Sequence, residues 1–124
     1  MNKVIKSEKA PAAIGPYSQA IESNGFVYVS GQLPINTETG TMPETIEEQT
    51  AQSLNNIKSI LEAAGFSMDN VVKTTVLMTN LGDFTKMNEV YGTFFSGAYP
   101  ARAAYQVVAL PKGAMVEIEA VASK

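Results

Sequence analysis

Arg102 is the residue of this sequence best suited to bind a small anion. It lies near the start of the segment 100–107, which begins with a proline and reads as a β-strand. A guanidinium is always charged and presents its N–H groups as a planar fork, so it can bind a carboxylate through two parallel hydrogen bonds. A surface arginine paired with one of the 12 acidic residues is the plainer interpretation. A ligand site therefore needs support from the rest of the chain.

Two glutamates near the C-terminus are the candidate proton carriers. Glu117 and Glu119 alternate with apolar residues, so they point to the same face of the last predicted strand. Two acids on one sheet face are usually solvated or paired with a neighbouring subunit. The alternative is that one of them lies near Arg102 and transfers a proton during catalysis.

Four further residues could line such a site. Tyr17 ends a loop rich in proline and glycine, where an aromatic plug with a solvent-facing hydroxyl is the simpler role. Ser30 next to Gly31, near the end of a strand, fits either close approach to the backbone or a plain β-bulge. Asn88 lies at the rim of an apolar helix face, where it could satisfy hydrogen bonds in the core or contact a ligand.

The composition excludes several kinds of chemistry. The 124 residues contain no cysteine and no histidine, so thiol nucleophiles, disulfides and histidine-based triads are excluded. Proton transfer must then use Glu, Asp, Tyr, Lys, backbone groups or water. The net charge of −3 argues against a dedicated nucleic-acid-binding surface, which is normally basic, so nucleic acid is an unlikely partner.

Length and charge content indicate one small domain that associates with copies of itself. Charged residues are 17% of the chain, below the usual quarter, which suggests that other subunits cover much of its surface. No apolar run follows the first residues and no run of 18 apolar residues occurs, so we expect neither a signal peptide nor a membrane span. A soluble cytoplasmic protein is the default expectation.

The predicted elements are three strands, a helix, a strand, a second helix and two strands. The Asn-Gly pair at 24–25 is a strong hairpin signal. Thr45 and Glu48 fit a capping box, Gly65 fits the C-terminal cap of that helix, and Asp83 fits the N-cap of the second helix. The strands are expected at 2–7, 18–23, 26–33, 70–78, 101–109 and 115–122. The apolar side of the second helix is formed by Phe84, Met87, Tyr91, Phe94 and Phe95.

This order predicts a mixed sheet with both helices on one face, because right-handed crossovers place them on the same side. The opposite face is expected to stay uncovered and to pack on other copies of the chain. The polar residues expected on that face are Ser30, Arg102, Gln106, Glu117 and Glu119.

Several stretches together resemble one family. They are 11–20 (PAAIGPYSQA), 30–34 (SGQLP), and 100–102 (PAR) followed by 116–119 (VEIE). The segments 52–57 and 72–76 fit as well, so the match runs over nearly the whole chain. Any one motif is weak, but the set in this order is specific. The chain resembles the Rid family (reactive intermediate/imine deaminase), and within it the RidA subgroup.

The resemblance implies an α+β, chorismate-mutase-like fold, related to the ferredoxin-like folds. It implies a single RidA-like domain over 1–124 that forms a homotrimer with sites in the clefts between subunits. The implied activity is hydrolysis of enamines and imines (2-aminoacrylate, 2-iminopropanoate, 2-iminobutanoate) to 2-keto acids and ammonia. The resemblance implies no cofactor and no metal.

The resemblance also assigns roles to individual residues. It implies that Arg102 binds the substrate carboxylate and that Glu117 activates water. Supporting contacts are implied for Tyr17, Ser30, Gly31, Asn88 and the backbone of Ala103. Many members have a cysteine two residues after the arginine, where this chain has Ala104. Thiol-linked behaviour should therefore be absent, whereas imine hydrolysis needs no thiol.

Two other functions stay open at this point. An endoribonuclease or translation inhibitor is one, since such activity is attributed to some relatives. A module that binds small keto acids without turnover is the other, because the same arginine pocket would serve it.

Overall fold

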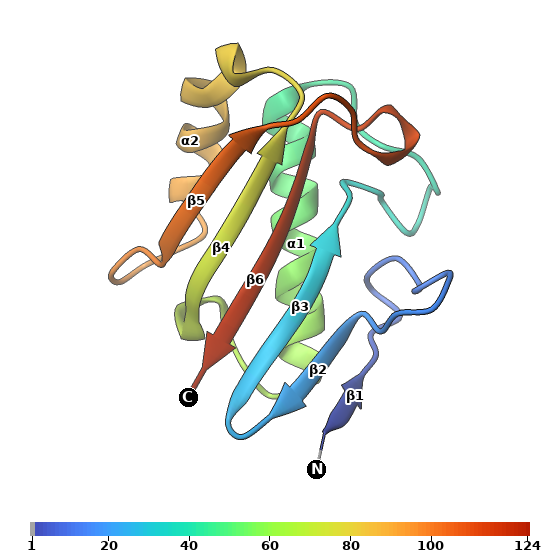
Figure 1. The fold of residues 1–124 in the computed structure, drawn as a ribbon, viewed down its shortest axis with the longest axis vertical. Helices are drawn as coiled ribbons and strands as arrows, with labels where there is room; N and C mark the ends of the chain where they lie inside the picture. The colour runs from blue at the N-terminus through green and yellow to red at the C-terminus, as the bar shows by residue number, and fades with distance from the viewer. Residues whose placement is uncertain (1) are drawn as a thin grey trace.

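The computed structural model describes residues 2–124 and contains one six-stranded sheet with two α-helices packed against it (Figure 1). The strands are β1 (Lys3–Ile5), β2 (Ala20–Ser23), β3 (Phe26–Gln32), β4 (Val71–Met78), β5 (Ala101–Gln106) and β6 (Val116–Ser123). The helices are α1 (Ile46–Ala63) and α2 (Phe84–Gly92), with short 3-10 turns η1 (Met68–Asn70), η2 (Leu81–Asp83) and η3 (Pro111–Gly113).

The strands lie in the order β1-β2-β3-β6-β4-β5. All neighbours are antiparallel except β4 and β5, which run parallel. Both β3 and β4 pair antiparallel with β6, so the crossover through α1 joins two strands of the same direction. The predicted mixed α+β fold is confirmed.

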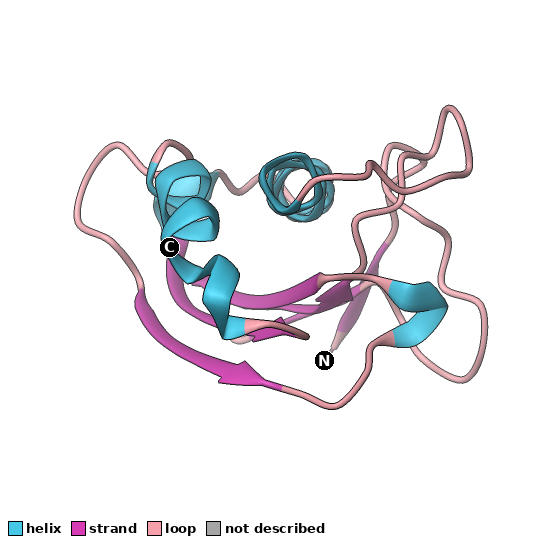
Figure 2. Cartoon of the chain, turned by 90° about the horizontal axis from the view of Figure 1, so that it is seen from above, coloured by secondary structure: helices cyan, strands magenta, loops and turns pink. Residues whose placement is uncertain are grey.

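Both helices cover the same face of the sheet, as Figure 2 shows from above. The apolar sides of the strands and helices meet there and form the core, in which Leu54, Ile57, Val76 and Ile118 are fully buried. Within residues 2–124 no helix lies over the opposite face. Three large aromatic side chains are exposed on that face, namely Phe26, Tyr28 and Tyr105. No helix in this part of the chain is long and apolar enough to cross a membrane.

The predicted ends of α1 are confirmed. Thr45 accepts a hydrogen bond from the backbone N–H of Glu48, and the Glu48 carboxylate accepts one from the Thr45 hydroxyl. At the other end Gly65 has a φ of 79°, a left-handed conformation that favours glycine, and Phe66 N–H donates to Leu61 O.

The start of α2 differs in detail from the prediction. Asp83 stands at the N-cap position but its side chain makes no capping hydrogen bond. Asn80 accepts instead from Gly82 N–H and begins the preceding turn η2. The helix ends at Gly92, so Phe94 lies beyond it in the following loop.

The sheet face predicted for Arg102 and Gln106 is wrong. Arg102 and Gln106 are register partners of Thr74 and Met78, which are buried under the helices. Register partners in a parallel pair point to the same side of the sheet. Arg102 and Gln106 therefore lie on the helix side. The residues of β5 around Arg102 are alanines, and the one large side chain of the strand, Tyr105, is exposed on the uncovered face, so the alternation could not tell which face is inside.

The prediction for β6 is confirmed. Val116, Ile118 and Ala120 are buried in the core, so Glu117 and Glu119 lie on the uncovered face.

The strand β3 is irregular near Ser30, because its register against β6 shifts between Val29 and Gln32. A bulge, one of the two alternatives that the sequence left open here, is therefore present at Ser30 and Gly31.

Candidate active site

Arg102 lies at the edge of the sheet and its guanidinium is held by three residues of α2. Its Nη1 donates a hydrogen bond of 2.8 Å to Asn88 Oδ1. Its Cζ lies 4.8 Å from the centroid of the Tyr91 ring and 5.2 Å from that of Phe84. Positions 84, 88 and 91 are four and three residues apart, so they share one helix face. The side chain of Arg102 itself remains exposed.

The Tyr91 ring is in turn fixed from behind. Its hydroxyl is 2.7 Å from the Thr74 hydroxyl, and both side chains are buried. The ring also packs at a tilt on Phe95, with centroids 5.0 Å apart. Burial raises the pKa of the Tyr91 hydroxyl above its ordinary value, against the smaller opposing effects of the Thr74 hydrogen bond and the Arg102 charge. The hydroxyl therefore stays protonated at neutral pH.

Glu117 lies on the uncovered face of the sheet, against the bulge of β3. A methyl group at position 31 would lie 3.0 Å from Glu117 Cδ and closer still to Oε2. Only glycine leaves this space free, which explains Gly31 by contact rather than by backbone angle. Burial raises the pKa of Glu117 above that of an ordinary glutamate, and the charge of Glu119 raises it further. A carboxylate with a raised pKa is suited to accept and return a proton near neutral pH.

Ser30 joins the bulge to the loop that carries Tyr17. Its hydroxyl donates a 2.6 Å hydrogen bond to the carbonyl of Ser18, and its N–H donates to the carbonyl of Gln19. Tyr17 is 54% exposed and directly precedes Ser18. The hydrogen bonds of Ser30 thus fix the segment that follows Tyr17 to the bulge, and Glu117 lies against Gly31 of the same bulge.

The buried amide of Gln19 holds this loop in place, a role that the sequence analysis missed. Its Nε2 donates to the carbonyls of Ser7, Ala10 and Pro11, and its Oε1 accepts from Ser7 N–H. Gln19 was predicted inside the strand 18–23, whereas β2 begins at the residue after it, and no signal of this network was visible in the sequence because its partners lie 8 to 12 residues earlier in the chain.

The predicted site residues therefore form two separate groups. Arg102 and Asn88 lie between β5 and α2 on the helix side, whereas Glu117 lies on the uncovered side. Strand β4 separates β5 from β6, and the register partners of Arg102 and Glu117 on it are Thr74 and Leu77. Three residues of strand amount to about 10 Å. A single chain thus does not bring Arg102 and Glu117 onto one small ligand.

Ala103 stands apart from both groups. It follows Arg102 in β5 and pairs with Thr75, so its side chain points to the uncovered face. Its backbone lies in the last strand of the sheet order.

The sequence analysis expected Phe84 and Tyr91 only as core residues and missed their contact with Arg102. Because Arg102 is the sole arginine of the sequence, a pair of aromatic rings that could stack on its guanidinium was the signal to look for.

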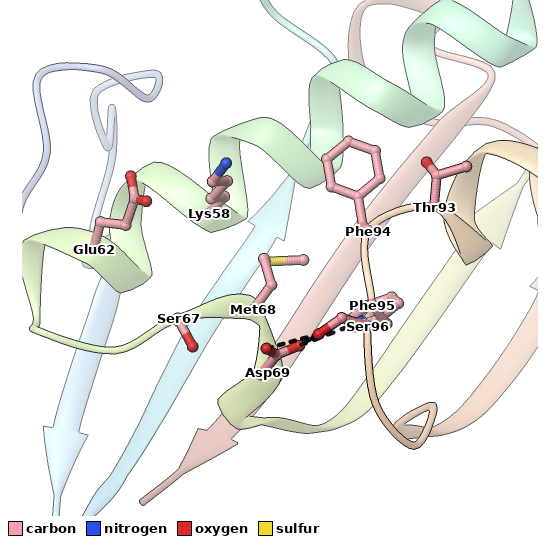
Figure 3. Close-up of a pocket in the computed structure, with 9 residues that line it drawn as sticks. All are labelled: Lys58, Glu62, Ser67, Met68, Asp69, Thr93, Phe94, Phe95 and Ser96. Atoms are coloured by element: carbon pink, nitrogen blue, oxygen red, sulfur yellow. Dashed lines mark hydrogen bonds between the residues drawn. The ribbon is translucent and has the colours of Figure 1, made fainter.

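A concave region of about 460 Å³ lies elsewhere, between α1, η1 and the loop after α2 (Figure 3). Met68, Phe94 and Phe95 line it together with charged and hydroxyl side chains, and Ser96 is hydrogen-bonded to Asp69. None of the predicted site residues contributes to it. As for metals, residues 2–124 contain no group of three or more Asp, Glu, His or Cys side chains placed to hold an ion.

Comparison with known proteins identifies the family. Residues 7–124 match the family described as endoribonuclease L-PSP. The chain belongs to this family. It is 52% identical to a mouse (Mus musculus) protein named 2-iminobutanoate/2-iminopropanoate deaminase, over 98% of the chain and 91% of that protein. The resemblance to the Rid proteins is thereby confirmed.

Solved structures of family members have the same fold. A protein of unknown function of the conserved Rid family, YyfA from Yersinia pestis, superposes with a TM-score of 0.97 at 49% identity, over 100% of both chains. Escherichia coli TdcF with bound serine superposes with a TM-score of 0.95 at 42% identity, over 98% of both chains.

Proposed function

We propose that this family member is a hydrolase of imines of 2-keto acids, a 2-iminobutanoate/2-iminopropanoate deaminase that works without a cofactor or metal. The mouse relative carries that name at 52% identity over nearly the full chain. The reaction consumes one water and one imine and yields one 2-keto acid and one ammonia. An enamine such as 2-aminoacrylate enters the same reaction after a proton adds to its terminal carbon.

Arg102 binds the substrate in this proposal. The imine carries a carboxylate next to its C=N carbon, and a guanidinium fork can hold that carboxylate through two hydrogen bonds. One bond to Asn88 engages a single N–H of the five on the guanidinium, so donors remain for the substrate. TdcF was solved with bound serine, which also has a carboxylate next to its nitrogen-bearing carbon.

Glu117 moves the protons. It takes a proton from a water as the water oxygen attacks the C=N carbon, and it passes that proton to the nitrogen, which gives the tetrahedral carbinolamine. Glu117 then takes the proton of the new hydroxyl and passes it to the same nitrogen as the C–N bond breaks. Ammonia leaves with both protons of the water, the carbonyl forms, and Glu117 is ionised again. The substrate is reactive by itself, so positioning and one proton carrier supply the catalysis.

The two groups of residues must meet across a subunit boundary for this chemistry. We propose that Arg102 and Asn88 of one chain face Glu117, Tyr17 and the bulge of a neighbouring chain. The backbone of Ala103, in the edge strand, completes the cleft. A homotrimer provides three such clefts, and the exposed aromatic side chains on the uncovered sheet face give it a surface to bury. In this arrangement the 1–124 domain is the repeating unit.

The environment of the Glu117 carboxylate is the main observation that supports the proposal. Its half-buried carboxylate lies against Gly31, and burial together with Glu119 raises its pKa, as general acid–base chemistry requires. A pure binding module would gain nothing from such a carboxylate near a bound anion, because like charges repel.

A coupled assay tests the proposal. A threonine dehydratase with threonine generates 2-iminobutanoate, and semicarbazide traps the imine that is still intact. Added protein should lower the initial rate of semicarbazone formation and raise that of 2-keto acid, with or without EDTA. An unchanged semicarbazone rate at micromolar protein would exclude the deaminase. Loss of the effect with EDTA would instead indicate a metal.

The family description names an endoribonuclease, so that activity is the second candidate. Cleavage of a single-stranded RNA probe by the same preparation, followed through successive purification steps, decides it. Activity that stays proportional to the protein would support a ribonuclease, whereas activity that separates from the protein would remove it.

A further inference from the structure

The hydrogen bond between Thr74 and Tyr91 lies directly behind the arginine. Thr74 is the register partner of Arg102, so its side chain stands on the adjacent strand and on the same face of the sheet. Its hydroxyl meets the Tyr91 hydroxyl at 2.7 Å in the buried layer between β4 and α2. The bond joins the strand next to the arginine to the helix whose ring lies 4.8 Å from its Cζ.

We propose that Thr74 and Tyr91 are positioning residues for Arg102. The bond holds the Tyr91 ring in one place, and the face of that ring attracts the guanidinium. Phe84 supplies a second ring at 5.2 Å and Asn88 an acceptor at 2.8 Å. The fork is thus oriented before the substrate arrives, and less side-chain entropy is lost when a carboxylate binds. The catalytic consequence rests on the proposed function, whereas the ordering of Arg102 does not.

The competing interpretation is that the two hydroxyls only satisfy each other in the core. Replacing both partners with apolar groups of the same shape is then nearly neutral for stability, and Arg102 would be unaffected. Two features of the structure favour the positioning role. The ring contacts the guanidinium itself, and Phe95 packs on the same ring, so the ring has little freedom to turn away.

The first experiment needs no substrate. Arg102 is the only arginine in the sequence, so its Nε–H gives a single side-chain signal in ¹⁵N NMR spectra of the whole protein. We expect that signal to be ordered in the wild type and to fall to an order parameter below about 0.6 in Tyr91→Leu. Tyr91→Phe and Thr74→Val both keep the ring but remove the hydrogen bond that holds it, so both should lie between the wild type and Tyr91→Leu.

Two matched controls separate local from general effects. Phe66 is a buried ring with Lys124 Nζ 4.8 Å from its centroid, so Phe66→Leu removes an equivalent cation–ring contact elsewhere. Thr50 is a buried threonine bonded to Ile46 O, so Thr50→Val removes an equivalent hydroxyl. Neither should change the Arg102 signal. If Tyr91→Leu fails to fold, the Thr74→Val/Tyr91→Phe double variant takes its place and should show reduced order.

The second experiment measures the consequence for binding. Pyruvate, a stable keto acid, is titrated by calorimetry into each folded variant. The strength of a cation–ring contact corresponds to an affinity loss of about 3- to 30-fold for Tyr91→Leu. In the imine assay KM should rise by the same factor with kcat nearly unchanged, because uniform binding is lost, and Tyr91→Phe, which keeps the ring, should raise KM by less than Tyr91→Leu does.

The outcomes of the two proposals are distinguishable. A wild type without imine turnover removes the deaminase, while the order of the Arg102 signal still decides the positioning role. Unchanged order and unchanged pyruvate affinity in Tyr91→Leu would overturn the positioning role even in an active enzyme. Equal losses in Phe66→Leu would do so as well, since they would reflect stability alone.

Discussion

The carboxylate of Glu117 occupies the space that a side chain at position 31 would fill. The two residues belong to neighbouring strands and meet where β3 bulges away from regular pairing with β6. The bulge, the glycine and the acid therefore form one structural unit. A substitution at Gly31 should act on function through the position of that carboxylate.

We expect Gly31→Ala to fold but to lose most of its imine deaminase activity. The new methyl group would meet the flexible end of Glu117, which can rotate away at a stability cost of about 1–2 kcal/mol. A displacement of about 1 Å at a catalytic group costs on the order of 10²-fold in rate. The thermal midpoint and kcat are measured together. Gly97→Ala is the control, because a Cβ there meets nothing within 4 Å.

Glu117→Gln should separate binding from chemistry. Glutamine keeps nearly the shape of glutamate but cannot take up a proton, so kcat should fall by about 10²–10⁴-fold. Affinity for pyruvate should persist or improve, because a negative charge near the ligand is removed. Calorimetry and the imine assay on the same preparation measure both. If Glu117→Gln turns over and Glu119→Gln does not, the proton carrier is Glu119.

The pH dependence of kcat/KM should have an acid limb set by Glu117. Its pKa is raised, so the ionised form that accepts a proton appears only above the usual glutamate range, and activity rises with pH through that pKa. Glu119→Gln removes one of the two causes of the raised pKa. The limb should therefore move to lower pH in that variant. A limb that stays in place would mean that another group limits the rate.

Arg102→Lys should fail nearly as badly as Arg102→Ala. An ammonium is a point charge that cannot make the paired hydrogen bonds of the fork, and it stacks less well on Tyr91 and Phe84. Loss of one charged hydrogen bond corresponds to about 10- to 100-fold in kcat/KM. Near-normal turnover of the lysine variant would show that bidentate binding is not required.

The protein should be a trimer at micromolar concentration. Light scattering should report three times the chain mass of 13.2 kDa. The expectation follows from the exposed aromatic side chains Phe26, Tyr28 and Tyr105, and from Arg102 and Glu117 facing opposite sides of one chain. A stable monomer with full activity would contradict the shared site. Equal mixtures of Arg102→Ala and Glu117→Gln chains, if subunits exchange, should regain part of the activity, because some clefts then contain neither substitution.

The sequence alone was enough for the order of the elements and for the ends of α1. A capping pair such as Thr45 and Glu48, or a left-handed glycine such as Gly65, acts over three or four residues, so its signal is contained in a short window. The alternation of Val116, Glu117 and Ile118 identified the faces of β6 correctly, because large apolar residues marked its inner side.

Only the tertiary structure decided where the chemistry lies. In β5 the residues around Arg102 are alanines, which fit either face, so the pairing of Arg102 with Thr74 was needed to place it beneath α2. The approach of Gly31 to Glu117 joins positions 86 residues apart, and the rings that hold Arg102 come from another element. Local sequence patterns specify which residues of a strand share a face. Long-range packing determines which of the two faces is buried and which side chains from different elements meet.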